Sequence, residues 1–123
     1  MSKIVAIGTA VPEHRHKQED ILDFMQRVYA LNEGDRRKLR FLYRQGGIET
    51  RYSVIPDYSR NADTWKFYSP TENLEPFPDL EQRMQWYQQH AAPLSTQAIN
   101  KCVENFTGNI THIITDSCTG MSA

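Results

Sequence analysis

The chain has 123 residues, of which 39% are hydrophobic and 24% are charged, a composition typical of one globular domain. With a formal net charge of -1, it lacks the overall basic field that holds nucleic acid or an anionic membrane surface. No apolar run reaches membrane-spanning length and the first residues do not resemble a signal peptide, so we expect a cytoplasmic protein without membrane insertion, with Cys102 and Cys118 reduced.

The first half of the sequence predicts a strand, two helices and another strand. Residues 4–8 are a β-branched run that ends at a glycine, which indicates a buried strand followed by a turn. Apolar residues recur at helical spacing over residues 18–31. A second helix is predicted from an N-cap at Asp35 to the glycine pair at 46–47. Residues 48–55 then alternate as a strand does.

The second half predicts a long loop, a helix and a last strand. Residues 57–78 contain three prolines and no sustained period, so we expect an ordered loop whose aromatic side chains pack onto a neighbouring surface. Asp79 is the expected N-cap of a helix that reaches Cys102, with a kink or a break at Pro93. Residues 109–115 are apolar again and predict a second buried strand.

This order of elements indicates an α/β layered fold. Both apolar runs have the pattern of strands that are buried on two faces, which requires helices on each side and further strands beside them. The 123 residues supply few such partners. We therefore expect the chain to form part of a larger sheet.

Cys118 follows the last predicted strand, where α/β sheets place their ligands. An activated thiolate needs a helix N-terminus, a histidine or a metal beside it, and none follows in the sequence. A thiol that lines a pocket or is buried is therefore the favoured interpretation.

The second predicted helix is strongly basic. Its cations suit the phosphates of a nucleotide-bearing cofactor, because arginine forks and lysine point charges both bind phosphate. From the residues alone, a solvated helix face balanced by Glu33 and Asp35 is the favoured interpretation, because this is the usual role of such a charge run. The five cations are Arg36, Arg37, Lys38, Arg40 and Arg44.

Two histidines and three aromatic residues suggest sites that the sequence does not otherwise support. His14 and His16 lack the cysteine or carboxylate spacing of a metal site, so we expect both on the surface. Trp65, Phe67 and Tyr68 would suit a stacking platform, but the near-neutral charge argues against nucleic acid.

Three stretches carry a family resemblance. They are "KIVAIGTAVPEH", "YRQGGIETRYSVI" and "THIITDSCTGMSA". Together they resemble the type III polyketide synthases, the chalcone and stilbene synthase family within the thiolase-like superfamily. The resemblance implies that residues 1–123 are part of the N-terminal half of a thiolase-like layered α-β-α fold, truncated before the family's catalytic cysteine. It also implies a cytoplasmic homodimer in the full-length protein.

The resemblance implies an acyltransferase that condenses an acyl-CoA starter with malonyl-CoA, both as substrates, with no permanently bound cofactor and no metal. No catalytic residue of the family falls within this chain, so we expect the chain alone to be inactive. The positions that match the family's acyl and polyketide pocket are Cys118, Thr119, Gly120 and Ala123. The positions that match or adjoin its CoA-binding residues are Lys38, Arg40 and Arg44.

Two alternatives stay open. A ketoacyl synthase of the fatty-acid initiating type shares the superfamily and the opening strand, and starter preference and the number of malonyl extensions would separate it. A non-catalytic binding or assembly module would instead depend on the aromatic loop and on unpaired sheet surface.

Overall fold

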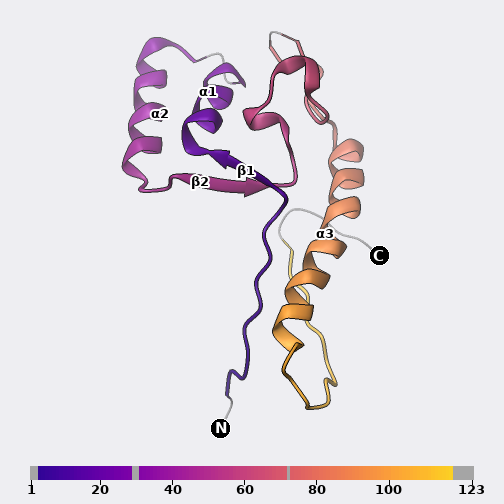
Figure 1. Cartoon of the computed structure of the whole chain (residues 1–123). Coiled ribbons are helices and arrows are strands. Elements are labelled where there is room, and N and C mark those ends of the chain that lie inside the picture. The colour runs from indigo at the N-terminus through magenta and orange to yellow at the C-terminus, as the bar shows by residue number, and fades with distance from the viewer. Residues whose placement is uncertain (1–2, 29–30, 72, 118–123) are drawn as a thin grey trace. The chain divides into compact units, whose positions relative to one another are not determined.

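The computed structural model describes residues 3–28, 31–71 and 73–117 (Figure 1). They form two compact units, Pro12–Pro78 and the pair of segments Met1–Val11 and Asp79–Ala123. The described residues combine helices with a small two-stranded sheet, so the mixed α/β character expected from the sequence is confirmed.

The Pro12–Pro78 unit contains both strands. β1 (His14–Lys17) pairs antiparallel with β2 (Thr50–Ser53), with His14 opposite Ser53 and Lys17 opposite Thr50. β1 was not predicted: its four residues are all polar, and their pairing with residues more than 30 positions away leaves no local signal. β2 lies within the predicted strand at residues 48–55 and is shorter than it.

Two helices connect the strands. α1 (Gln18–Val28) follows β1 directly, carries acidic residues in its first turn and buries Ile21, Leu22 and Phe24. α2 (Glu33–Gln45) leads back to β2, and Figure 1 shows the two helices side by side. Helical periodicity predicted both helices, but α1 ends at Val28, before the predicted limit at residue 31, and residues 29–30 lie outside the described residues.

The start of α2 corrects one prediction. Asn32, not Asp35, is the N-cap, and its side-chain oxygen accepts the backbone N–H of Asp35 at 2.9 Å. Asn32 has the extended backbone that an N-cap needs, while Asp35 lies in the first turn, where its negative charge favours the helix dipole. The predicted end was correct, since the Gly46 N–H caps the Leu42 carbonyl.

Residues 57–78 form the expected ordered loop. They contain two short 3₁₀ helices, η1 (Asp57–Ser59) and η2 (Ala62–Thr64). Three aromatic side chains of this loop pack around Phe24 of α1, which is the neighbouring surface that the sequence led us to expect. Ring centroids lie 5.0 Å from that of Phe24 for Tyr58 and Tyr68, and 5.5 Å for Trp65. Burial raises the pKa of Tyr58.

The second unit is organised by one long helix. α3 (Leu80–Val103) begins at Asp79, whose carboxylate accepts the Gln82 N–H at 2.8 Å, so the predicted cap is confirmed. Pro93 lies inside this helix and does not divide it into two. Gly8 packs so closely on α3 that a Cβ there would collide with Ala98 and Cys102.

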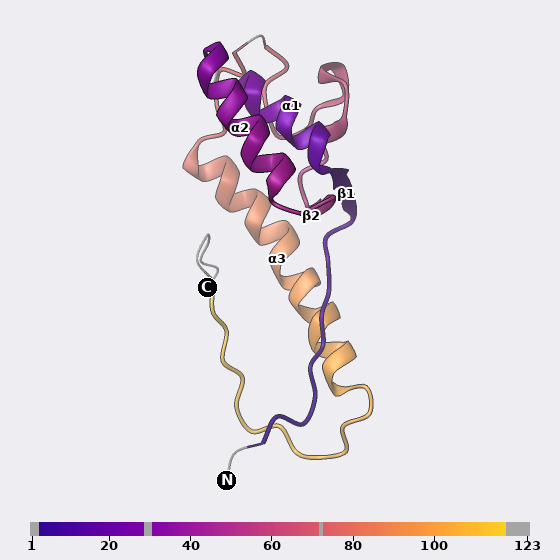
Figure 2. The ribbon, with the colours of Figure 1, turned by 90° about the vertical axis from the view of Figure 1, so that its left-hand side faces the viewer.

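The two apolar runs form no strand among the described residues, so the prediction of two buried strands was wrong. Both runs are extended, and they run in the same direction, opposite to that of α3 (Figures 1 and 2). Their side chains stay exposed because no ladder partner or covering layer meets them within residues 3–11 and 79–117. The exposed fractions are 80% for Ile4, 68% for Val5, 79% for Ile7, 51% for Ile110, 70% for Ile113 and 95% for Ile114.

Candidate functional site

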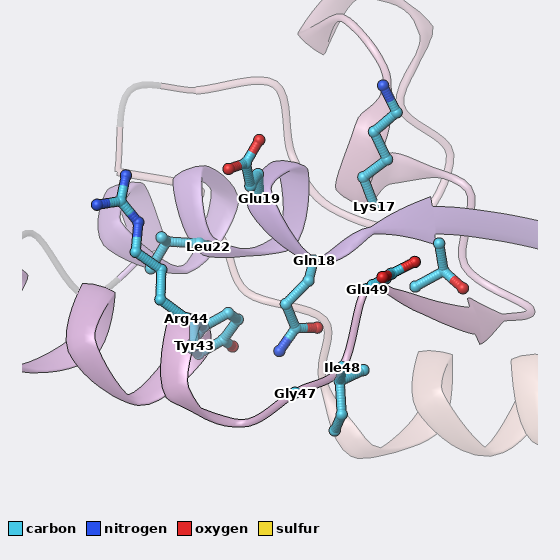
Figure 3. Close-up of a pocket in the computed structure, with 10 residues that line it drawn as sticks. Lys17, Gln18, Glu19, Leu22, Tyr43, Arg44, Gly47, Ile48 and Glu49 are labelled. Atoms are coloured by element: carbon cyan, nitrogen blue, oxygen red, sulfur yellow. The ribbon is translucent and has the colours of Figure 1, made fainter.

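A pocket of about 510 Å³ lies in the Pro12–Pro78 unit, where α1, α2 and the start of β2 meet (Figure 3). Its lining comes from three places in the sequence that the fold brings together. Residues 17–22 contribute Lys17, Gln18, Glu19 and Leu22, α2 contributes Tyr43 and Arg44, and residues 47–50 contribute Gly47, Ile48, Glu49 and Thr50.

The turn after α2 fixes one wall of the pocket. Gly47 has a φ of +63°, a conformation that favours glycine, and this turn directs the chain from α2 into β2. The backbone N–H of Gln18 then donates to the Glu49 carbonyl at 2.9 Å. Arg51 Nε donates to the largely buried Gln18 side chain at 3.1 Å. Backbone and side-chain hydrogen bonds therefore join both sides of the pocket.

The lining combines an apolar body with separated charges. Leu22, Tyr43 and Ile48 supply hydrophobic surface, while two cations and two carboxylates belong to the same lining. Figure 3 shows Arg44 and Lys17 at opposite ends of the labelled group, so they do not converge on one point. The pocket suits an elongated ligand that presents an anionic group near Arg44 and an apolar part beside Leu22 and Tyr43.

The three predicted CoA-binding cations are all exposed on α2, but the structure does not bring them together equally. Arg44 lines the pocket, and Arg40, one turn earlier, lies on the same face of the helix. Lys38 lies roughly 200° around the helix from Arg40. Lys38 also donates to Asp35 at 3.1 Å, and this hydrogen bond holds the pKa of Asp35 below its ordinary value. Arg40 and Arg44 are the cations best placed for a shared ligand.

The predicted acyl-pocket residues Cys118, Thr119, Gly120 and Ala123 lie outside the described residues. The neighbouring Ser117 is described, and its hydroxyl oxygen accepts a hydrogen bond from the Tyr87 hydroxyl of α3 at 2.9 Å. This bond connects the end of the second apolar run to the first half of α3.

The expectation that both histidines lie on the surface was wrong for His16, which is only 2% exposed. It lies in β1, where alternate residues face opposite sides of the strand, so the neighbours Arg15 and Lys17 stay exposed. Its ring nitrogens contact the Ser59 hydroxyl at 2.7 Å and the Ile55 carbonyl at 3.0 Å. The alternation of histidine with charged residues over 14–17 was the only local signal for this site.

Among residues 3–28, 31–71 and 73–117, no cluster of three or more histidine, cysteine or acidic residues has a geometry that could hold a metal ion. None of the helices in these ranges is long and apolar enough to cross a membrane. Comparison with protein-family models, with curated proteins and with solved structures finds no match for this chain.

Proposed function

We propose that this chain belongs to an acyltransferase resembling the type III polyketide synthases, and that its pocket beside Arg44 binds the nucleotide end of CoA thioesters. The whole enzyme would load an acyl group from CoA onto a cysteine and extend it with malonyl-CoA. The observation that carries the proposal is the 510 Å³ pocket at the C-terminal end of a basic helix, lined by Arg44.

The chemistry of the pocket supports this ligand class. CoA joins several phosphates to a long, uncharged pantetheine arm, so it needs cations at one end of its site and apolar surface beyond them. Arg40 and Arg44 are exposed and lie one helical turn apart, and neither side chain forms a hydrogen bond or an ion pair with another described residue. Leu22, Tyr43 and Ile48 offer the apolar surface. A layered α-β-α arrangement is part of the same proposal.

Two extended runs are consistent with that layered fold. They run parallel to each other and opposite to α3 (Figure 2), as the strands and the helix of a parallel sheet unit do. Their exposed isoleucines and valine are surfaces that such a sheet would cover.

The test is a calorimetric titration of the chain with CoA. We expect Arg44→Ala and Arg40→Ala each to weaken binding about fivefold, equivalent to about 1 kcal/mol for an exposed charge-assisted contact. Lys38→Ala should have a smaller effect, because Lys38 lies on another face of α2 and pairs with Asp35. Lys101→Ala on α3 is the matched control that removes one cation from the other unit.

Equal affinities for the native chain, Arg40→Ala and Arg44→Ala would contradict the proposed site. A ketoacyl synthase of the fatty-acid initiating type would bind CoA in a comparable way, so CoA binding does not distinguish the two activities. Assays of the full-length enzyme distinguish them by starter preference and by the number of malonyl extensions.

The exposed apolar runs favour a second candidate, a non-catalytic assembly module. Ile114 is 95% exposed and Ile113 is 70% exposed, which is unusual for adjacent isoleucines. Association that rises with concentration in light scattering, that Ile114→Asp reduces, and that occurs without CoA binding would favour this candidate over the enzyme.

A further inference from the structure

A second hollow in the Pro12–Pro78 unit, of about 240 Å³, is lined by a serine hydrogen-bonded to a buried histidine. It lies between α1 and residues 57–65, which include η1 and η2, and it shares no lining residue with the larger pocket. The polar residues that line it are Asp20, Asp23, Arg27, Asp57, Tyr58, Ser59 and Arg60, together with the indole of Trp65.

The hydrogen bonds fix the tautomer of this histidine. His16 Nε2 lies 3.0 Å from the Ile55 carbonyl oxygen, which can only accept, so Nε2 carries the hydrogen. In the neutral ring, Nδ1 is then an acceptor, and the Ser59 hydroxyl donates a hydrogen bond to it at 2.7 Å. Burial lowers the pKa of His16, which keeps the ring neutral and able to accept a proton at pH 7.

Both partners are held by regular structure. His16 lies in β1 opposite Arg51 of β2, and the Tyr58 ring meets the imidazole edge-on at 5.5 Å. Ser59 ends the 3₁₀ turn that begins at Asp57, whose buried carboxylate accepts three backbone N–H groups. The Ser59 side of the pair is exposed to solvent, while its histidine is 2% exposed. A serine in contact with an oriented, neutral imidazole and open to a hollow is the arrangement that nucleophilic catalysis needs.

We propose that Ser59 is a nucleophile and His16 its general base, in a site that accepts the acyl group of small esters. Ser59 Oγ bonds to the ester carbonyl carbon while its proton passes to His16 Nδ1. The bond from that carbon to the leaving oxygen then breaks, and the leaving alcohol takes the proton from Nδ1. Water attacks the acyl-serine in the same way, with Nδ1 as base, and releases the acid and free Ser59.

The hollow defines the class of substrate. A volume of about 240 Å³ admits a short acyl group and not a long chain. Two cations line the hollow: Arg27 stacks over the Trp65 ring and donates to the Thr71 carbonyl, whereas Arg60 adjoins Ser59 and is the cation nearer in sequence to a developing oxyanion. Asp20 and Asp23 line the same hollow and offset the charges of its two arginines, so the lining does not select for a charged substrate. We therefore infer neutral short-chain esters.

The test uses p-nitrophenyl acetate as substrate and diisopropyl fluorophosphate as label, with the labelled residue located by peptide mass spectrometry. We expect one adduct, on Ser59, and a loss of hydrolysis of at least tenfold in Ser59→Ala. Ser69→Ala is the matched control, because the Ser69 hydroxyl donates to the Pro76 carbonyl at 2.8 Å and has no imidazole partner. A label on another residue, or unchanged hydrolysis in Ser59→Ala, overturns the proposal.

A second pair of variants tests the role of His16 without removing it from the core. In Ser59→Cys the imidazole should promote formation of the thiolate, so iodoacetamide should alkylate that position at least tenfold faster at pH 7 than it alkylates Ser69→Cys. Equal rates overturn the assignment of His16 as a base.

Discussion

Among the described residues of the Pro12–Pro78 unit, His16 and Asp57 are the most deeply buried polar ones, at 2% and 1% exposed. Each replaces lost water with several hydrogen bonds, as buried polar groups must. Asp57 accepts the backbone N–H groups of Lys66, Phe67 and Tyr68 at 2.8–2.9 Å, and His16 connects β1 to Ser59 and Ile55. Together they tie residues 57–68 to the rest of the unit.

Asp57→Asn should destabilise the chain by about 2–3 kcal/mol, because one side-chain oxygen is replaced by an NH₂ group that faces backbone donors. Urea unfolding followed by circular dichroism measures the change. Asp63→Asn, at an exposed position in η2, is the matched control and should change stability by less than about 0.5 kcal/mol. Equal effects at the two positions would mean that the Asp57 carboxylate does not hold the loop.

His16 should make stability depend on pH. Burial lowers its folded-state pKa, so below about pH 6.5 the unfolded chain binds this proton more readily than the folded chain. Above that pH both states are neutral at His16. Its contribution is therefore constant above about pH 6.5 and is lost progressively as the pH falls from there towards the lowered folded-state value.

Urea midpoints measured between pH 5 and 8 check this dependence. His14 and Arg60 oppose the charged imidazole, while Asp20 and the Ile55 carbonyl favour it. His16→Gln should flatten the dependence of the urea midpoint on pH below about pH 6.5, whatever the substitution does to stability at pH 7. An identical slope in the variant would show that other groups cause the pH dependence.

At the scale of elements, the turn from α2 to β2 shapes the larger pocket. Gly47 adopts a φ of +63°, and an added Cβ would meet no atom within 4 Å, so a substitution there costs backbone conformation alone. Gly47→Ala should destabilise the chain by about 1 kcal/mol, and Gly47→Asn by less, because asparagine tolerates this conformation better. Thermal unfolding compares the two, and a larger cost for asparagine would contradict the conformational explanation.

Helices could be predicted from the sequence because their signals are local. The Asp79 cap of α3 depends on Gln82 three residues later, and the apolar residues of α1 recur about one helical turn apart. Local signals did not identify the N-cap of α2, because Asn32 and Asp35 are both good cap residues and lie three positions apart. Strands depend on remote partners: β1 needs β2, while the run at 109–115 has the composition of a strand without a ladder among the described residues.

At the scale of the whole molecule, the sequence indicated part of the candidate site. Arg44 was one of the five cations of the basic helix and adjoins a CoA-binding position of the family, and the structure places it in the larger pocket. The other half of that lining, at 17–22, could not be inferred, because only the pairing of β1 with β2 brings it beside α2. The Ser59–His16 contact was missed for the same reason, since 43 positions separate the two residues.

Binding of CoA beside Arg44 can be followed residue by residue in an NMR titration of the ¹⁵N-labelled chain with CoA. We expect saturable amide shifts at Arg44 and over residues 47–50, with smaller shifts along the preceding turn of α2, and their loss in Arg44→Ala. Saturable shifts confined to α3, or no shifts at millimolar CoA, would show that CoA does not bind beside Arg44.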